Sequence, residues 1–236
     1  IALFFFVIAM INPKMGTKLE SFKRMGVDIV FAVDVSKSML AEDISPSRLD
    51  KSKQIVNEII FSLNGDRIGL IAYAGKAIPQ LPLTTDYSAA TMFLQNLNTD
   101  MLSSQGTAIG DAIQLSISYF DDDEQTERLL FIISDGEDHN EFSSDIANIA
   151  SKNNIKIHTI GVGTVKGSPI PIRKNNIISS YKKDLNGEVV ITKLNRDYLK
   201  NISKASLGKY IDGLITKDVL SEVNEILSNT EKKEFD

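Results

Sequence analysis

The chain has 236 residues, of which 42% are hydrophobic and 24% are charged, an ordinary composition for one principal globular domain. It contains no cysteine, which excludes disulfides, thiolate zinc sites and cysteine nucleophiles, and the spacing of its two histidines offers no metal-binding pair. The formal net charge is −5 and no basic cluster is long enough to follow a phosphate backbone, so no nucleic acid partner is predicted.

The chain begins with an uninterrupted apolar run over residues 1–11, which is shorter than the roughly 20 residues that span a bilayer. Because the first residue is Ile and not Met, residues 1–12 are interpreted as the tail of a transmembrane helix, with a buried core segment as the alternative. Residues 13–26 are polar and basic, and they are predicted to form a juxtamembrane linker.

Strand and helix patterns then alternate through a domain predicted to span residues 27–228. Apolar runs predict strands at residues 28–33, 67–73, 77–83, 128–134, 156–162 and 209–211. Helical patterns begin at Ser47 and Thr107, extend from the N-cap Asp86 to residue 97, and cover residues 143–152, 196–206 and 216–227. This alternation predicts an α/β fold, doubly wound, with a mostly parallel six-stranded sheet and helices on both faces.

The helical pattern lapses within residues 164–194. Prolines occur at positions 169 and 171, and the turn dipeptide Asn186-Gly187 lies between apolar runs at residues 177–181 and 189–191. These features predict an inserted β-hairpin in which the two runs pair across the Asn-Gly turn. Residues 229–236 are predicted to be a polar tail.

Oxygen-bearing side chains occur at three points where strands end or helices begin. Asp34, Ser36 and Ser38 follow one apolar run, Asp135 follows another, and Thr107 opens a helical pattern. In a doubly wound sheet the carboxyl ends of parallel strands meet at one edge, so these five residues are expected to lie together. Hard oxygen donors of this kind suit Mg²⁺, which prefers octahedral oxygen coordination and keeps some of its waters. The sequence therefore predicts one metal site.

The same five residues, in this chain order, resemble the metal-ion-dependent adhesion site of von Willebrand factor A domains. Further segments at residues 39–44, 65–70, 83–87, 103–110 and 160–163 resemble the bacterial Bat aerotolerance membrane proteins, and residues 167–172 resemble the BatB branch. Lys37 departs from the family pattern, in which small or amide residues are usual. Its ammonium either folds away from the site or weakens cation binding.

This resemblance implies that Ser36, Ser38 and Thr107 bind Mg²⁺ directly, with Mn²⁺ or Ca²⁺ as alternatives, while Asp34 and Asp135 act largely through waters. A carboxylate from a partner protein then fills the open coordination position. The implied function is non-enzymatic, metal-dependent protein–protein interaction within a membrane-anchored Bat-type complex linked to oxidative or envelope stress tolerance. The implied partners are other Bat-family A-domain and tetratricopeptide proteins and a MoxR-type AAA ATPase.

The expected location is the bacterial inner membrane. The basic residues after the apolar run favour a cytoplasmic domain by the positive-inside rule. The family favours a periplasmic domain, because in its members a more basic loop precedes this helix. The periplasmic side is the expectation adopted here.

Two other functions are weighed against this interpretation. One is a Mg²⁺-dependent phosphatase or phosphotransferase with Asp34 as nucleophile, although haloacid-dehalogenase-like enzymes need a second acid two residues later, where this chain has Ser36. The other is a structural assembly subunit whose metal site is vestigial. A dinucleotide site is not predicted, because the glycines at positions 161 and 163 lack the third glycine and the following helix.

Neighbouring polar residues are given structural interpretations. Residues 138–141 are interpreted as a solvated loop, with His139 as a candidate partner contact, and His158 as a packed strand residue. Asp111 is either a second-shell group of the metal site or an acid favoured by the helix dipole.

Overall fold

Six strands form the central sheet of the computed structural model, which describes residues 24–104, 106–120, 127–137, 143–175, 177–230 and 233–235. In order across the sheet, the strands are β11 (Tyr210–Asp212), β6 (Ile155–Gly161), β5 (Arg128–Ser134), β2 (Asp28–Asp34), β3 (Arg67–Tyr73) and β4 (Ala77–Thr84). All neighbouring pairs are parallel except β3 and β4, which are antiparallel. The predicted mostly parallel six-stranded sheet is confirmed.

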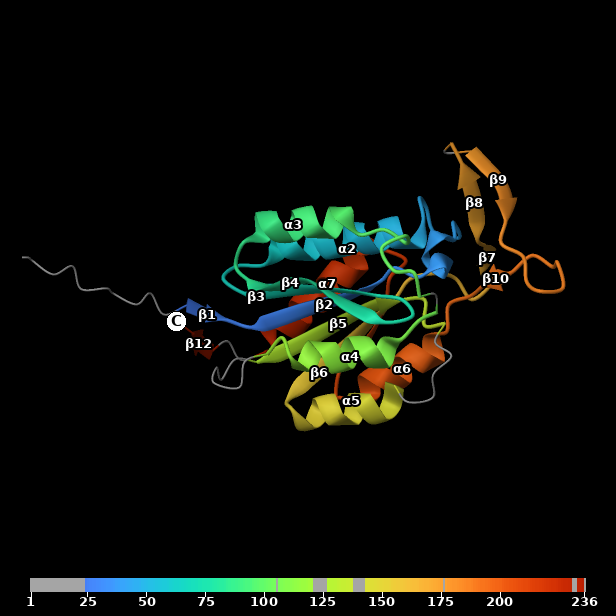
Figure 1. The fold of residues 1–236 in the computed structure, drawn as a ribbon. Coiled ribbons are helices and arrows are strands. Elements are labelled where there is room, and N and C mark those ends of the chain that lie inside the picture. The colour runs from blue at the N-terminus through green and yellow to red at the C-terminus, as the bar shows by residue number, and fades with distance from the viewer. Residues whose placement is uncertain are drawn as a thin grey trace, which may run out of the picture.

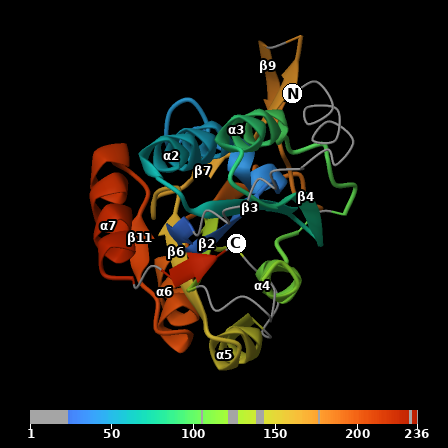
Figure 2. The same cartoon turned by 90° about the vertical axis from the view of Figure 1, so that its left-hand side faces the viewer.

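Helices cover both faces of the sheet (Figures 1 and 2). One face carries α2 (Arg48–Ser62), α3 (Tyr87–Asn96) and α7 (Thr216–Ser228), and the other carries α4 (Ile109–Ile117), α5 (Ser143–Lys152) and α6 (Arg196–Ala205). Two helices begin as the sequence predicts. Ser47 Oγ accepts the Asp50 N–H at 3.1 Å, and Asp86 Oδ1 accepts the Ala89 N–H at 2.9 Å.

Strand β2 shows why the sheet is covered on both sides. Its side chains alternate between two apolar clusters, with Ile29, Phe31 and Val33 in the α2–α3–α7 layer and Val30 and Ala32 in the α4–α5–α6 layer. All five are fully buried. This central parallel strand is therefore apolar between its two ends, which are Asp28 and, at the carboxyl end, Asp34.

The inserted segment, residues 164–194, forms two antiparallel pairs. Strand β8 (Pro171–Lys174) pairs with β9 (Ile177–Tyr181) to form a projecting hairpin, which we call the arm, and β7 (Ser168–Pro169) pairs with β10 (Ile191–Thr192) at its base (Figure 1). The predicted insertion is present, but the predicted pairing is wrong. The run at 177–181 pairs with the preceding strand β8, and the turn between them contains Asn175. Asn175 adopts a positive φ of 52°, which asparagine tolerates. The chain also turns at Asn186-Gly187, but there it forms an isolated bridge, Lys183 to Val189, with flanking backbone hydrogen bonds and no regular strand pair.

A short ribbon closes the amino end of the sheet. Strand β1 (Arg24–Gly26) pairs antiparallel with β12 (Lys233–Phe235), at the end of the molecule opposite to the arm (Figure 1). These strands lie in regions predicted to be linker and polar tail, and the assigned domain boundaries stay predictions. Among the described residues, no helix has the length and apolar character needed to cross a membrane. The predicted transmembrane tail, residues 1–12, lies outside the described residues.

His158 is a packed residue of β6, as predicted. Its ring stacks on Phe131 with centroids 5.1 Å apart, and its Nδ1 accepts the Lys209 N–H at 3.1 Å. Burial, with the nearby charges of Lys156 and Lys209, lowers the pKa of His158 from 6.5 to about 4. The unfolded chain therefore binds a proton at His158 at a higher pH than the folded chain does. The contribution of His158 to the unfolding free energy is fully present above pH 6.5, and it is lost as the pH falls toward 4.

We expect His158→Asn, which keeps an acceptor near the position of Nδ1, to flatten this dependence. Between neutral pH and pH 4 the wild type should lose about 2–3 kcal/mol more unfolding free energy than the variant, given about 1.4 kcal/mol per pKa unit. Urea unfolding across this pH range measures the difference. Parallel pH profiles for the two proteins would contradict the assignment.

Candidate metal centre

Adjacent strand ends bring the first polar residues of the site together. Val33 of β2 pairs with Ile133 of β5, so Asp34 and Ser134, the next residue of each strand, are neighbours across the ladder. Ser134 Oγ donates a hydrogen bond of 2.7 Å to Asp34 Oδ2. Asp135 follows Ser134 directly and, like Asp34, is fully buried. The carboxyl edge of the sheet thus gathers two acids, as predicted.

The loop after β2 turns sharply and presents two hydroxyls. The Ser36 N–H donates to Asp34 Oδ1 at 2.8 Å, which fixes the turn, and the short helix η1 (Lys37–Leu40) follows. The Oγ atoms of Ser36 and Ser38 lie 2.9 Å apart. Two hydroxyl oxygens therefore converge just beyond the Asp34 carboxylate.

Thr107 completes the set from the loop before α4. Ser36, Ser38 and Thr107 line one pocket of about 150 Å³, together with Gly106 and Glu137 among others. Gly106 has a φ of +119°, a conformation that favours glycine, and the next residues are anchored by the Ala108 N–H, which donates to Ala74 O at 2.6 Å. The structure therefore gathers all five predicted residues at one edge of the sheet, with the hydroxyls in the pocket and the acids buried beneath.

Asp34 has an unusual electrostatic position. It is fully buried, and within the described part of the chain its oxygens accept hydrogen bonds from Ser36 and Ser134 but contact no cationic side chain. Burial and the neighbouring negative charge of Asp135 raise the pKa of Asp34 to about 7. A bound cation opposes both effects, because it favours the ionised carboxylate. Three hydroxyl oxygens above an uncompensated buried acid therefore fit a hard divalent cation.

Arg48 compensates the other acids of this edge. Its side chain is fully buried, and its Nε and Nη2 donate to the two oxygens of Asp43 at 2.8 and 2.9 Å. Its Nη1 donates to Asp135 Oδ2 at 2.7 Å. The planar guanidinium bridges two carboxylates at once, a geometry that lysine does not offer.

The same network attaches both ends of the inserted segment to the site. The backbone N–H and hydroxyl of Thr164 donate to Asp43 Oδ2 at 2.8 and 2.9 Å. At the other end, Arg48 Nη1 donates to Thr192 Oγ1 at 2.9 Å, and Thr192 Oγ1 donates to Glu137 Oε2 at 2.6 Å. Both ends of the inserted segment are therefore bound to the network through which Arg48 contacts Asp135.

Sequence reasoning missed Arg48, Asp43, Glu137 and Thr192. A charged residue in the first turn of an amphipathic helix suggests a solvated face, so the pattern gave no sign that Arg48 is buried. Glu137 gave a weak signal, because it comes two residues after Asp135 in the same loop.

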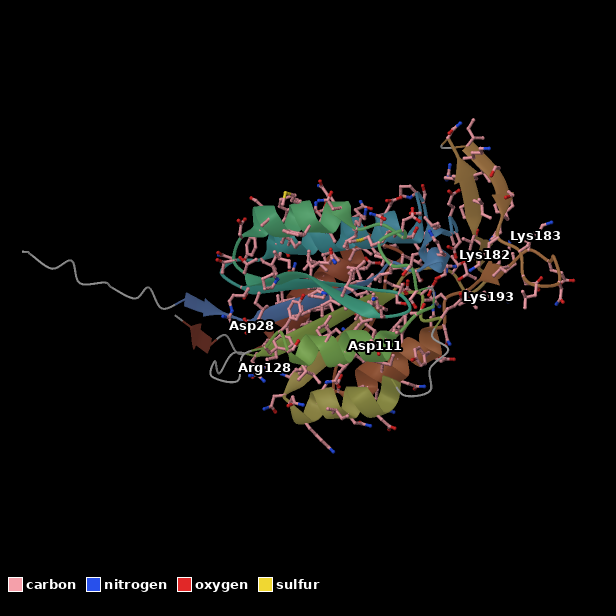
Figure 3. The ribbon with its side chains drawn as sticks, in the orientation of Figure 1. Asp28, Asp111, Arg128, Lys182, Lys183 and Lys193 are labelled. Atoms are coloured by element: carbon pink, nitrogen blue, oxygen red, sulfur yellow. The ribbon has the colours of Figure 1, made fainter. Side chains whose placement is uncertain are left out.

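Sequence patterns also give expectations for Lys37, Asp111 and residues 138–141, which lie near the site in the sequence. The Lys37 ammonium folds away from Asp34 and contacts Thr99 and Asp100. Asp111 is exposed in the first turn of α4 and does not line the pocket, which fits the helix-dipole interpretation (Figure 3). Residues 138–141, interpreted as a solvated loop, lie outside the described residues.

Comparison with known proteins identifies the family. The von Willebrand factor type A domain profile matches residues 29–137. An aerotolerance-related membrane protein from Bacteroides fragilis, solved with multiple mutations to serines, is 35% identical with a TM-score of 0.83, over 87% of this chain and 100% of that structure. This chain belongs to the von Willebrand factor type A domains of the BatB-like aerotolerance-related proteins.

Two further solved structures are similar to this chain, one at the level of the family and one at the level of the fold. BatB from Bacteroides thetaiotaomicron is 36% identical with a TM-score of 0.80, over 86% of this chain and 100% of that one. Proximal thread matrix protein 1 from the mussel byssus, described with a zinc-occupied MIDAS motif, is 17% identical with a TM-score of 0.61, over 85% of this chain and 46% of that one, and shares the fold alone. The chain spans about half the length of the curated relatives it matches.

We expect Arg48→Leu to lower the unfolding free energy by about 3–5 kcal/mol, because it leaves Asp43 and Asp135 buried without their cation. Arg173→Leu is the matched control, since Arg173 pairs with Glu42 on the surface and should cost at most about 1 kcal/mol. Chemical denaturation of the two variants compares them directly. Equal losses would show that the Arg48 network does not stabilise this edge of the sheet.

Proposed function

We propose that this chain is a non-enzymatic, metal-dependent protein-binding domain of a membrane-anchored Bat-type complex linked to oxidative or envelope stress tolerance. The observation that carries the proposal is a buried acid, Asp34, which has no cationic partner among the described residues, together with three hydroxyls that line one pocket at the same edge of the sheet. Membership of the BatB-like family supports it.

In this proposal Ser36, Ser38 and Thr107 hold the cation through their hydroxyl oxygens. Asp34 and Asp135 supply negative charge, largely through waters, while Ser134 and the Ser36 N–H orient the Asp34 carboxylate. The bound cation would offer an open coordination position to a carboxylate from a partner protein. No covalent step is required of the chain.

Mg²⁺ is the proposed cation, with Mn²⁺ and Ca²⁺ as alternatives. Among the described residues that line the pocket, the side-chain oxygens belong to Ser36, Ser38, Thr107 and Glu137, and these are hard donors. Within the described residues, no group of three or more His, Cys, Asp or Glu side chains is placed to hold a metal. A site here depends on its hydroxyls. The zinc-occupied motif of the mussel protein shows that a fold relative carries a metal at this kind of site.

The geometry gives no support to the phosphotransferase alternative. A nucleophilic aspartate must present an oxygen to substrate, whereas Asp34 is fully buried and both of its oxygens accept hydrogen bonds from the protein. The position two residues later is Ser36, which supplies no second acid. Binding without chemistry is therefore favoured.

The proposed partners are other Bat-family A-domain and tetratricopeptide proteins and a MoxR-type AAA ATPase. The proposed location is the bacterial inner membrane with the domain on the periplasmic side. The description of the Bacteroides fragilis relative as a membrane protein supports the membrane part of this proposal.

Isothermal titration of Mg²⁺ and Mn²⁺ into the 236-residue chain tests the site. We expect the wild type to bind, and Asp34→Asn and Thr107→Ala each to lose at least about tenfold in affinity, because each removes a group that holds or neutralises the cation. Ser118→Ala, which removes an exposed hydroxyl directly after α4 that does not line the pocket, should leave the affinity unchanged. Circular dichroism checks that each variant is folded. Absence of binding by the wild type would reject the proposed function.

A further inference from the structure

The inserted segment, residues 164–194, differs in charge and surface from the rest of the chain. It carries six Lys or Arg residues against two Asp or Glu, while the whole chain has a net charge of −5. It also exposes apolar side chains, among them Ile172, Ile177 and Tyr181 on the arm. Exposed apolar area mixed with positive charge is typical of a surface that contacts an acidic partner.

A groove runs from the metal pocket along the foot of this segment. The pocket of about 150 Å³ shares Lys37, Ile170 and Lys182 with a wider cavity of about 690 Å³. One wall of that cavity is the inserted segment from Ile170 to Arg173, and the other includes Leu40 and Pro46 from the domain. The metal pocket and the larger, partly apolar cavity therefore adjoin each other.

Lys182 is the available cation of this groove. The other two cations that line it are paired, Lys37 with Asp100 and Arg173 with Glu42. Within the described residues, the Lys182 ammonium makes no hydrogen bond or ion pair, although Lys182 lines both the metal pocket and the wider cavity. Figure 3 places it at the base of the arm.

The acids that line the two cavities with Lys182 are already engaged. Glu137 lines the metal pocket, but its oxygens accept hydrogen bonds from Thr192 Oγ1 and from the Lys193 N–H, both at 2.6 Å. Its carboxylate is thus directed to the base of the inserted segment. In the wider cavity, Glu42 pairs with Arg173, Asp100 pairs with Lys37, and Asp50 Oδ2 accepts a hydrogen bond from Ser47 Oγ at 2.7 Å. Lys182 is therefore open to an anion that a partner supplies.

A protein segment fits this groove better than a lipid surface does. The arm projects from the carboxyl edge of the sheet, whereas β1, which continues from the predicted membrane-proximal residues, lies at the opposite end (Figure 1). The groove is also a channel with two walls, which suits an extended chain and not a flat layer of headgroups.

We propose that this groove binds an extended acidic segment of a partner protein through two carboxylates, one at the metal and one at the Lys182 ammonium. The inference rests on the proposed function, because it uses the same metal site. It adds a second, protein-supplied recognition point, so the partner needs two acidic side chains and not one.

Fluorescence anisotropy with a neutral-dye-labelled tetraglutamate amide tests this proposal, with tetraglutamine as the uncharged comparison. In Mg²⁺ the 236-residue chain should bind tetraglutamate and not tetraglutamine, and chelation of the metal should abolish binding. Lys182→Ala should weaken binding about fivefold, as expected for one partly exposed charge contact. Lys183→Ala is the matched control, since it removes the same charge from the adjacent residue, which lines neither cavity, and should change affinity less than about twofold.

Each other outcome overturns the proposal in a distinguishable way. Equal losses of tetraglutamate affinity in the two lysine variants would show a general attraction between charges and no specific contact at Lys182. Binding of Mg²⁺ by the chain with no binding of tetraglutamate would reject this inference and leave the proposed metal site intact. Failure to bind Mg²⁺ would reject both. Lysine-dependent binding to phosphatidylglycerol vesicles, with none to tetraglutamate, would identify a lipid surface as the occupant.

Discussion

The buried guanidinium of Arg48 is the interaction on which the functional edge of this domain depends. It reaches from the start of α2 to Asp43 in the preceding loop and to Asp135 at the end of β5. Through Thr164 and Thr192 the same cluster fixes both ends of the inserted segment. Desolvating these charges is costly, so the cluster is stable only when all of its members are present. Loop placement at this edge is therefore set by electrostatics, in contrast to the apolar packing that sets the sheet.

The compensation by Arg48 is selective. Asp43 and Asp135 have a cation, whereas Asp34 has none within the described residues, and its raised pKa reflects that difference. In the proposed function, a divalent cation bound at this edge would favour the ionised carboxylate of Asp34. Lys182, which also lines this pocket, is a positive charge that has no ion-pair partner among the described residues.

The fold was predictable because its signals are local and repeated. Apolar runs such as 28–33 and 128–134 are long enough to identify buried parallel strands, and the site residues follow these runs directly. The pairing within residues 164–194 was not predictable, because Asn186-Gly187 is a stronger turn signal than Asn175, yet the regular strand pair forms across Asn175 and only an isolated bridge forms across Asn186-Gly187. The role of Arg48 was not predictable either. Its partners lie 5, 87 and 144 residues away, and only the folded topology brings them together.

The ribbon formed by β1 and β12 has a mechanical consequence. Arg24 lies opposite Phe235 in an antiparallel pair of three residues at the amino end of the sheet. Tension applied through the chain on either side of this ribbon would peel its hydrogen bonds apart one at a time before loading the long parallel strands. The arm lies at the far end of those strands (Figure 1). Moderate tension would thus open the β1–β12 pair first, before it reaches the carboxyl edge of the sheet.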